Sequence, residues 1–358
     1  MLNIRFGLSG DYGMKDVLRK TVQSLMVIVV LAAAGLGVRV LTAGGMRSEQ
    51  SATRMIMGTF ANVTAVGRGE ARIQKSFRAA FDRLSEVDEG MSDYLSESEL
   101  SQLNEHGYEG PVKVSEGLFE VIKAAVEYSR ISDGAFDVTV GPEVRLWRRT
   151  EKEGKAPTEA ELAEAKAKTG YEKLILDEKE RTVRFAVEGM VLDLGGIAKG
   201  YAIDLAVEAM KEAGVAGGLV NVGGDIRCFG RSPKGDNIWR IGLEDPAGTS
   251  DMLEVLEVAD MAVATSGDYR RFVMIDNKRY SHIINPHTTK SADELTSVTI
   301  IAPSAIQADA LATAVSVAGA KKGLEMVEGI EGVEAIVIPA GKELRFEQTS
   351  GAGAFVKK

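Results

Sequence analysis

Four short segments of this chain combine residue types that can do chemistry. The first, DLGGIAKG, runs from Asp193 to Gly200 between a predicted strand and a predicted helix. Glycines at such a junction let a ligand approach the backbone, and the free N–H groups of the first helical turn attract anions. Lys199 lies in that turn against the helix dipole, which a bound phosphate would explain. Neither GxGxxG nor GxxxxGK[ST] is matched, so a purely structural tight turn fits equally well.

The second segment, DALAT, places Asp309 four residues before Thr313. On a helix these two positions share a face, which would aim a carboxylate and a hydroxyl in the same direction. Both groups are oxygen donors suited to Mg²⁺. A solvated helix face is the commoner reason for such a pair, and that alternative stays open.

The third and fourth segments are turns. YSHIINP holds His282, with His287 just beyond it, and these are two of the three histidines in the chain. His282 could act as base, acid or ligand-positioner, or be an ordinary hydrogen-bonded turn residue. SDGAFDVTVGP reads as a turn followed by a strand that ends in Gly-Pro. There Gly134 suits a positive φ, and Asp137 would either cap the turn or hydrogen-bond a ligand.

Composition narrows the possible chemistry. The 358 residues are 45% hydrophobic and 27% charged, which supports a folded core, and the formal net charge of −9 disfavours nucleic acid as a partner. One cysteine and three histidines exclude zinc-finger and HExxH sites. We therefore expect any metal to be a hard cation held by oxygens, such as Mg²⁺.

The N-terminal part of the sequence resembles a targeting segment. Residues 21–38 carry no charge and would span about 27 Å as a helix. Lys15, Arg19 and Lys20 precede them, which predicts that the following chain is exported. We expect residues 1–45 to be a signal peptide or membrane anchor and residues 46–358 to lie in the periplasm or on the outer face of the inner membrane. A buried core helix is the weaker alternative, because the stretch has no polar face.

Periodicity predicts the elements that position these segments. We expect strands at 57–67, 174–177, 182–186, 190–193, 217–230, 239–243, 261–266, 271–275, 297–302 and 334–338. We expect helices at 70–88, 96–104, 115–132, 152–169, 198–213 and 305–318. Strands occur in consecutive groups as often as they alternate with helices. This favours an α+β fold, with mixed or antiparallel sheets and packed helices.

In their order and spacing, these segments together resemble the ApbE family, the FAD:protein FMN transferases. The resemblance covers roughly residues 55–319 and rests on MGTFANV, MSDYLSESELSQLN, DGAFDVTVGPEVRLW, LDLGGIAKGYAID, NVGGDI, ATSGDYRRF, SHIINP and ADALATA. One departure is the run INPHTTK, where we would expect a glycine after the first Thr, and often Asp in place of Asn285.

The resemblance implies Mg²⁺-dependent transfer of FMN from FAD to a Thr or Ser hydroxyl, with release of AMP. It implies as acceptor a subunit of a membrane redox complex, similar to Rnf or the Na⁺-translocating NADH:quinone reductase. The residues implied to contact FAD are Met57, Tyr94, Ala135, Phe136, Asp137, Asp193, Lys199 and Ile283. The metal would be held by Asp309, Thr313 and the carbonyl of Gly196, and either His282 or Asp309 would take the acceptor proton.

Two other functions remain open. The same site could hydrolyse FAD to FMN and AMP, or the protein could bind FAD in the periplasm without turnover. A cytoplasmic dehydrogenase fits worst, since no dinucleotide fingerprint is present.

Overall fold

The computed structural model describes residues 48–246, 252–267, 272–275, 278–341 and 344–357. The segment interpreted as a signal peptide or anchor lies outside these ranges. Within them, no helix combines the length and apolar character needed to span a bilayer.

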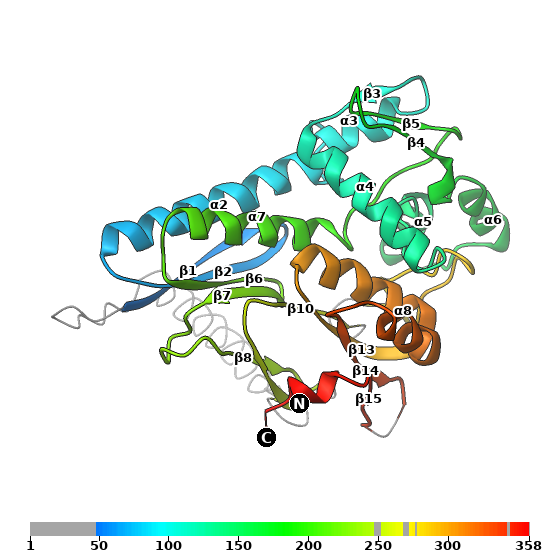
Figure 1. The fold of residues 1–358 in the computed structure, drawn as a ribbon. Coiled ribbons are helices and arrows are strands. Elements are labelled where there is room, and N and C mark those ends of the chain that lie inside the picture. Colours follow the sequence, from blue (N-terminus) through cyan, green and yellow to red (C-terminus); the bar gives the residue numbers. More distant parts are fainter. Residues whose placement is uncertain (1–47, 247–251, 268–271, 276–277, 342–343, 358) are drawn as a thin grey trace, which may run out of the picture.

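The centre of the fold is an eight-stranded sheet in which all neighbouring strands are antiparallel (Figure 1). In spatial order its strands are β1 (Ser48–Ile56), β2 (Thr59–Gly67), β6 (Gly217–Val222), β7 (Asp225–Gly230), β10 (Ala262–Gly267), β13 (Leu295–Ala302), β14 (Glu334–Pro339) and β15 (Glu347–Gln348). The predicted α+β class with antiparallel sheets is confirmed.

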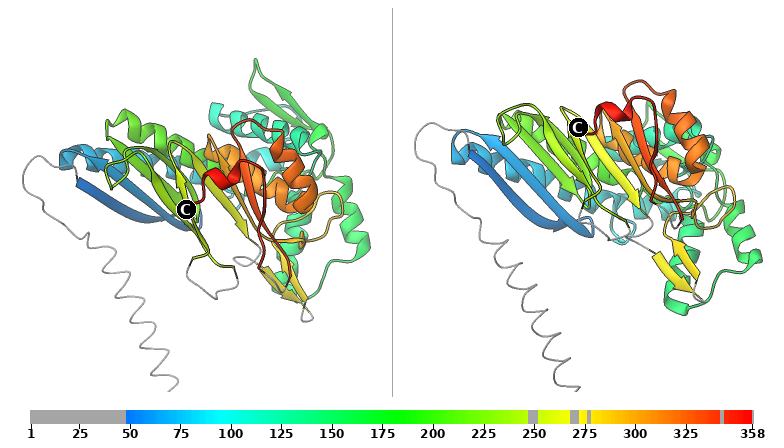
Figure 2. Two further views of the ribbon diagram at one scale, coloured as in Figure 1. Left: turned by 60° about the horizontal axis from the view of Figure 1, so that its bottom comes forward. Right: turned by 90° about the horizontal axis from the view of Figure 1, so that it is seen from below.

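Three helices cover one face of this sheet, and a hairpin covers the other (Figures 1 and 2). The helices are α2 (Glu70–Met91), α7 (Ala198–Glu212) and α8 (Ala305–Glu328), and the hairpin joins β8 (Trp239–Leu243) to β9 (Glu254–Val258). Side chains alternate along each strand, so Ala262 and Ala264 belong to the core on the helix side, whereas Val263 packs with the hairpin.

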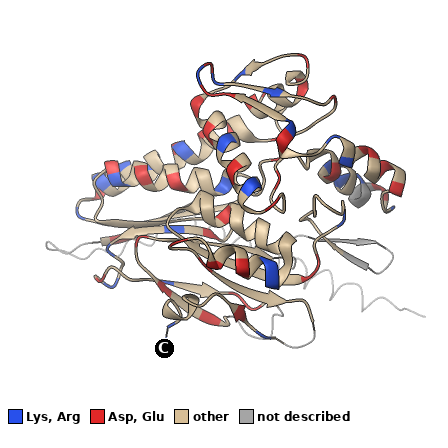
Figure 3. Ribbon diagram, turned by 45° about the vertical axis from the view of Figure 1, so that its right-hand side comes forward, with Lys and Arg blue, Asp and Glu red and all other residues tan. Residues whose placement is uncertain are grey.

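A second group of elements stands beside these layers. It contains α3 (Glu99–His106), α4 (Glu116–Ile131), α5 (Gly141–Glu153), α6 (Glu159–Ala167), the short helix η1 (Tyr171–Lys173) and a small sheet of β3 (Val112–Lys113), β5 (Thr182–Phe185) and β4 (Leu174–Asp177). A hairpin of β11 (Phe272–Ile275) and β12 (Lys278–Ser281), and the short helix η2 (Ala352–Ala354), complete the described elements. Lys and Arg are interspersed with Asp and Glu along the helices (Figure 3).

Local sequence explains where several elements begin. Ser98, Ser115 and Thr158 each accept a hydrogen bond from a backbone N–H in the first turn of α3, α4 and α6. The β1–β2 hairpin turns through Met57 and Gly58, whose φ angles of 55° and 67° suit a two-residue turn with left-handed residues.

Some predictions of local structure are wrong. The strand expected at 217–230 is two antiparallel strands, β6 and β7, joined by a turn at Gly223 and Gly224. The strand expected to end at Gly141-Pro142 is a series of turns, and Gly141 begins α5 instead, because proline is compatible with the first turn of a helix. The single helix expected at 152–169 is divided between α5 and α6. The strand expected at 190–193 is reduced to an isolated bridge between Val140 and Val191.

Helices α7 and α8 meet at a very close crossing. A Cβ atom on Gly200 would lie 2.3 Å from the backbone oxygen of Ala305. The start of α8 is capped from α7, because the Asp204 carboxylate accepts hydrogen bonds from the N–H groups of Ala305 (2.8 Å) and Ile306 (2.9 Å). Glycine at position 200 is therefore what lets the two helices approach.

We predict that Gly200→Ala lowers the free energy of unfolding by about 1–3 kcal/mol, because the added methyl group must push α7 away from α8. Urea denaturation followed by circular dichroism measures this change. Gly90→Ala in α2 is the matched control, since no atom lies within 4 Å of its added Cβ, and it should leave stability unchanged or slightly raise it. Equal effects of the two substitutions would contradict the close-packing argument.

Glu143 is a buried carboxyl in the first turn of α5. Its Oε2 accepts a hydrogen bond from the Thr169 hydroxyl at 2.6 Å, whereas Oε1 has no hydrogen-bond partner among the described residues. Burial raises the pKa of Glu143 above its ordinary value of 4.5, although the hydrogen bond from Thr169 opposes this shift.

Because the folded protein binds this proton more tightly than the unfolded chain, Glu143 makes stability fall as pH rises from about 4.5 through the raised pKa. We predict that Glu143→Gln and the unchanged protein unfold with similar free energies at pH 4. Above that pH the variant should gain about 1.4 kcal/mol for each pKa unit of the shift. Denaturant titrations from pH 4 to 8, with the exposed Glu127→Gln as control, measure the difference. If the difference in unfolding free energy between Glu143→Gln and the unchanged protein does not vary with pH, the raised pKa of Glu143 is refuted.

Candidate functional site

A buried group of three charges joins α7, α8 and the sheet. The Lys199 ammonium forms ion pairs with the carboxylates of Asp225 and Asp309, the latter at 3.2 Å. Asp309 also accepts a hydrogen bond from the Gly200 N–H at 3.0 Å, and Asp225 accepts one from the Thr265 N–H at 3.3 Å. The position of Lys199 against its helix dipole thus has a second explanation besides a phosphate, namely these two carboxylates.

Burial changes the protonation behaviour of these charged groups. The Asp309 residue is only 3% exposed, so the interpretation of Asp309 and Thr313 as a solvated helix face is wrong. Burial raises the pKa of Asp309, and the neighbouring Lys199 charge opposes that shift. Burial alone would lower the pKa of Lys199, but the charges of Asp225 and Asp309 outweigh it and raise that pKa.

The glycine turn before α7 lies directly against Thr313. A Cβ on Gly196 would be 2.9 Å from the Thr313 hydroxyl oxygen and 3.3 Å from the ring of Phe136. The structure therefore brings together the two segments that the sequence analysis expects to grip one ligand. Among the described residues, no cluster of three or more His, Cys, Asp and Glu side chains could hold a metal. A cation at this place would instead use the Asp309 carboxylate, the Thr313 hydroxyl and the Gly196 carbonyl, which are hard oxygen donors suited to Mg²⁺.

A second charged cluster lies at the other end of the glycine turn. The Asp193 carboxylate accepts hydrogen bonds from the Gly195 N–H at 2.8 Å and from Arg148 at 2.9 Å. Arg148 also pairs with Asp93, and its guanidinium lies 4.8 Å from the centre of the Tyr94 ring. Burial raises the pKa of Asp193, against the effect of Arg148. Tyr94 itself is 76% exposed.

The segment after Gly134 is held mainly by its own hydrogen bonds. Asp137 is buried and accepts hydrogen bonds from the N–H and hydroxyl of Thr139 at 2.8 and 2.6 Å, and from the Tyr171 N–H at 3.0 Å. Asp137 thus acts within the described structure as a cap, one of its two predicted roles. Ala135 and Phe136 are also buried, so their side chains offer little surface to a ligand.

The remaining predicted residues lie on turns. Met57 donates its N–H to Asp88 at 2.7 Å, at the tip of the β1–β2 hairpin. Ile283 is half-buried, and its carbonyl accepts a hydrogen bond from the Ala292 N–H at 2.9 Å. His282 lies exposed in the bend that follows β12. Among the described hydrogen bonds and ion pairs, none joins Met57 or Ile283 to the Lys199 group.

Thr289 occupies the position where the family resemblance leads us to expect glycine. Its φ of 61° is the left-handed conformation that glycine favours. Thr289 is buried, and its carbonyl accepts a hydrogen bond from the Trp147 indole at 3.0 Å. The turn therefore keeps a backbone shape suited to glycine although its sequence departs from the expected pattern, at a cost of roughly 1–2 kcal/mol.

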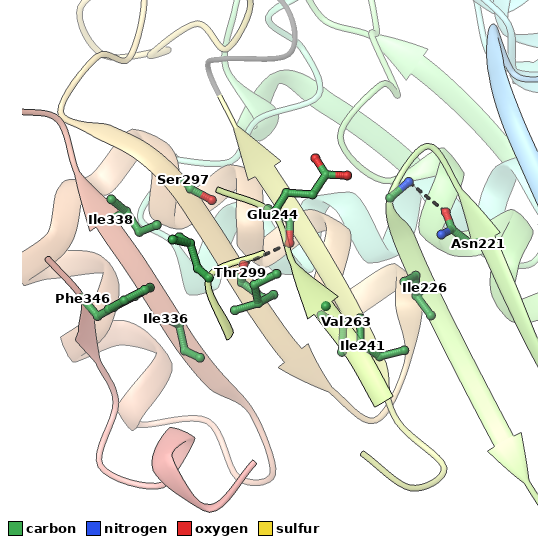
Figure 4. A pocket seen from close by; sticks show the side chains of 15 residues that line it. Asn221, Ile226, Ile241, Glu244, Val263, Ser297, Thr299, Ile336, Ile338 and Phe346 are labelled. Carbon is green, nitrogen blue, oxygen red and sulfur yellow. Dashed lines mark hydrogen bonds between the residues drawn. The ribbon is translucent and has the colours of Figure 1, made fainter. Parts of the chain in front are cut away.

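Two cavities lie within the described structure. A cavity of about 450 Å³ is lined by Trp147, Tyr280 and Asn285, and by Ser316 and Val317 one helical turn beyond Thr313. A smaller one of about 90 Å³ lies between the β8–β9 hairpin and the main sheet (Figure 4). The smaller cavity is lined by Val263 and Thr299, from the sheet face opposite α8, so it is separate from the Lys199 group.

Sequence reasoning missed three residues that the structure places in these clusters. Asp225 was visible within NVGGDI but was given no role, although its register at the start of β7 places it on the helix-covered face. Arg148 directly follows the DGAFDVTVGPEVRLW segment, and Asp93 lies inside MSDYLSESELSQLN. Their pairing depends on tertiary contacts that no local pattern encodes.

Comparison with known proteins gives consistent results. The profile of the ApbE family matches residues 57–337. A FAD:protein FMN transferase of Vibrio cholerae is 36% identical over 277 residues, covering 76% of this chain and 82% of that protein. The same-named protein of Haemophilus influenzae is 34% identical over 285 residues, covering 76% and 81%.

Solved structures agree in fold as well as in sequence. The ApbE protein of Thermotoga maritima has a TM-score of 0.80 and 31% identity, covering 87% of this chain and 100% of that one. The flavin transferase ApbE of Vibrio cholerae has a TM-score of 0.77 and 31% identity, covering 86% and 99%. With a family match over most of its length, relatives above 30% identity and a shared fold, this chain belongs to the ApbE family.

Proposed function

We propose that this protein transfers FMN from FAD to a hydroxyl group of a protein, with AMP as the leaving group. Its curated relatives are named FAD:protein FMN transferase. The observation that carries the proposal is the contact of the Gly196 turn with Thr313, beside the buried group of Lys199, Asp225 and Asp309. This places oxygen donors, a fixed positive charge and an accessible backbone turn around one point.

In this reaction the residues would act mainly by electrostatic stabilisation. A Mg²⁺ ion on Asp309, Thr313 and the Gly196 carbonyl would stabilise the charge that grows on the diphosphate as its phosphorus is attacked. Lys199 adds a second positive charge from the first turn of α7. The acceptor oxygen forms a bond to the FMN phosphorus, the bond to the AMP phosphate breaks, and the acceptor proton must be taken up.

His282 is the better candidate for that proton. Both oxygens of Asp309 already accept hydrogen bonds, one from Lys199 and one from the Gly200 N–H. The same carboxylate is needed for the metal, so taking up the acceptor proton would compete with metal binding. His282 is exposed, so an incoming polypeptide can reach it, and an imidazole changes charge near neutral pH.

FAD would extend from the proposed metal site along the cluster of Arg148 and Tyr94 and into the larger cavity. The exposed Tyr94 ring offers a flat face for stacking. The cavity of about 450 Å³ has the size of a small-molecule site and begins one helical turn beyond Thr313. Met57, Asp193, Ile283 and the Ala135–Asp137 segment would complete the binding surface.

The place of action is proposed from the sequence, and the acceptor from the family resemblance. The uncharged stretch at 21–38 supports export, to the periplasm or the outer face of the inner membrane. The acceptor that the family resemblance implies is a Thr or Ser of a membrane redox subunit, of the Rnf or Na⁺-translocating NADH:quinone reductase kind. An exported enzyme would reach an acceptor on that side of the membrane directly.

The function is tested by incubating the protein with FAD, Mg²⁺ and a candidate redox subunit, and then weighing the subunit by intact-mass spectrometry. We expect the subunit to gain the mass of one FMN, and AMP to appear only when the subunit is present. AMP release without the subunit would identify an FAD pyrophosphatase instead. FAD binding without any AMP would identify a carrier.

In the same assay, Asp309→Asn should slow FMN transfer at least about a hundredfold, because it removes an anionic oxygen donor from the metal site. The matched control is Asp82→Asn on the exposed side of α2, which should transfer FMN at the normal rate. Thermal unfolding verifies that both variants are folded. Normal activity of the folded Asp309 variant would remove this carboxylate from the site.

Lys199→Met tests the positive charge separately. We expect the dissociation constant for FAD to rise about tenfold, since a charge-assisted contact to the diphosphate is lost. Quenching of flavin fluorescence on binding measures it. Lys211→Met on the same helix is the control, because that lysine lies at the far end of α7, where it pairs with the exposed Glu208 and contacts the Phe229 ring. Unchanged FAD affinity in a folded Lys199 variant would rule out the phosphate contact.

A further inference from the structure

The Arg148 side chain joins the loop after α2, which contains Tyr94, to the glycine turn before α7. Its two terminal nitrogens contact different carboxylates, that of Asp93 in the loop after α2 and that of Asp193 before α7, the latter at 2.9 Å. Its guanidinium plane also lies 4.8 Å from the Tyr94 ring centre. One guanidinium thus fixes two segments that are a hundred residues apart in sequence.

The exposure of these groups indicates more than a structural bridge. The side chains of Asp93 and Asp193 are 18% and 13% exposed, and that of Arg148 is 37% exposed. Tyr94, which Arg148 contacts, is 76% exposed. A large aromatic ring held in place on one side and open on the other is a platform on which a planar ligand can stack.

Charge gives the second argument. Asp93 and Asp193 are two carboxylates that flank the place where the diphosphate would bind, and alone they would repel it. Arg148 pairs with both through separate nitrogens and so offsets part of their charge. The planar fork of arginine also fixes the directions of these two contacts more rigidly than an ammonium would. The neighbouring Arg149 differs, since it pairs with Glu153 and Glu161 on the exposed side of α5 and α6.

We propose that Arg148 is a positioning residue for the FAD substrate: it holds the Tyr94 ring ready to stack on one of the aromatic rings of FAD, and it keeps Asp93 and Asp193 from repelling the diphosphate. The proposal rests on the proposed function, because FAD is the ligand considered. Arg148 acts through Tyr94 and the two aspartates and takes no part in the bond changes.

The test compares FAD binding and turnover in Arg148→Ala, Arg148→Lys and the control Arg149→Ala, all in the full chain. Arg148→Ala should raise the dissociation constant and KM for FAD about tenfold or more and leave kcat within about threefold. Arg148→Lys should bind FAD with an affinity between those of Arg148→Ala and the unchanged protein. Lysine restores the positive charge but not the two-nitrogen geometry of arginine. Arg149→Ala should bind FAD normally. Normal FAD binding by a folded Arg148→Ala protein, or a loss confined to kcat, would overturn the proposal.

Two double variants separate the ring from the charge. If Arg148 acts on the ring, Arg148→Ala combined with Tyr94→Ala should weaken FAD binding less than the sum of the single effects. If it also shields the diphosphate, Arg148→Ala with Asp93→Asn should recover part of the lost affinity. Strict additivity in the first case and no recovery in the second would together reject the positioning role.

Folding and function have separate controls. Should Arg148→Ala not fold, the same comparison uses Arg148→Lys and the Arg148→Ala/Asp93→Asn variant, which leave fewer unpaired carboxylates. If the unchanged protein binds no FAD, the proposed function fails and Arg148 is not at issue. If it binds FAD and the Arg148 variants bind equally well, only the inference about Arg148 fails.

Discussion

The attraction between the Lys199 ammonium and two buried carboxylates is the constraint on which this structure depends. Asp225 comes from the sheet, Asp309 from α8 and Lys199 from α7, so one set of charges fixes three elements relative to one another. The carboxylate side chains are 7% and 5% exposed, and isolated charges at such depth would be strongly disfavoured. The close approach of α7 to α8 at Gly200 is what makes these distances attainable.

The glycine turn lies between two such centres. Lys199 lies at its helical end, with Asp225 and Asp309, and Arg148 lies at its N-terminal end, with Asp93 and Asp193. Each centre contains one positive and two negative groups, and would therefore gain from an added cation. A diphosphate that arrives with Mg²⁺ fits this balance better than a free diphosphate does. The metal requirement implied by the family resemblance thus has a physical counterpart in the charges of this chain.

Much of the fold follows from sequence patterns, because most elements carry a strong local signal. The apolar stripe of α2 and the serine caps of α3 and α4 are examples that the structure confirms. The wrong predictions fall where tertiary contacts decide. Val191 lies in the apolar run Met190–Leu192, which is typical of a strand, but among the described residues it pairs only with Val140. The largely polar sequence of β1 is held in the sheet by its partner β2. The kink at Gly319, with φ of 79°, lies within α8, beyond the predicted end at residue 318.

In the candidate site, too, some features could be predicted from the sequence and others are decided by tertiary contacts. Proximity of the Gly196 turn and Thr313 follows from the family resemblance, whereas the roles of Asp225 and Arg148 emerge only in three dimensions. Thr289 is the opposite case, since its sequence argues against a left-handed turn that the backbone nonetheless adopts. Burial and the hydrogen bond from Trp147 hold that conformation.

The site draws on residues from Asp93 to Asp309, and this spread has a consequence for how the chain matures. Contacts between such distant segments close large loops, so they form late in folding and lag behind local hairpins such as β1–β2. A partly folded chain would possess helices and hairpins but not yet the assembled candidate site. Capture of FAD would then mark the completion of folding, and unfinished chains would not sequester the cofactor.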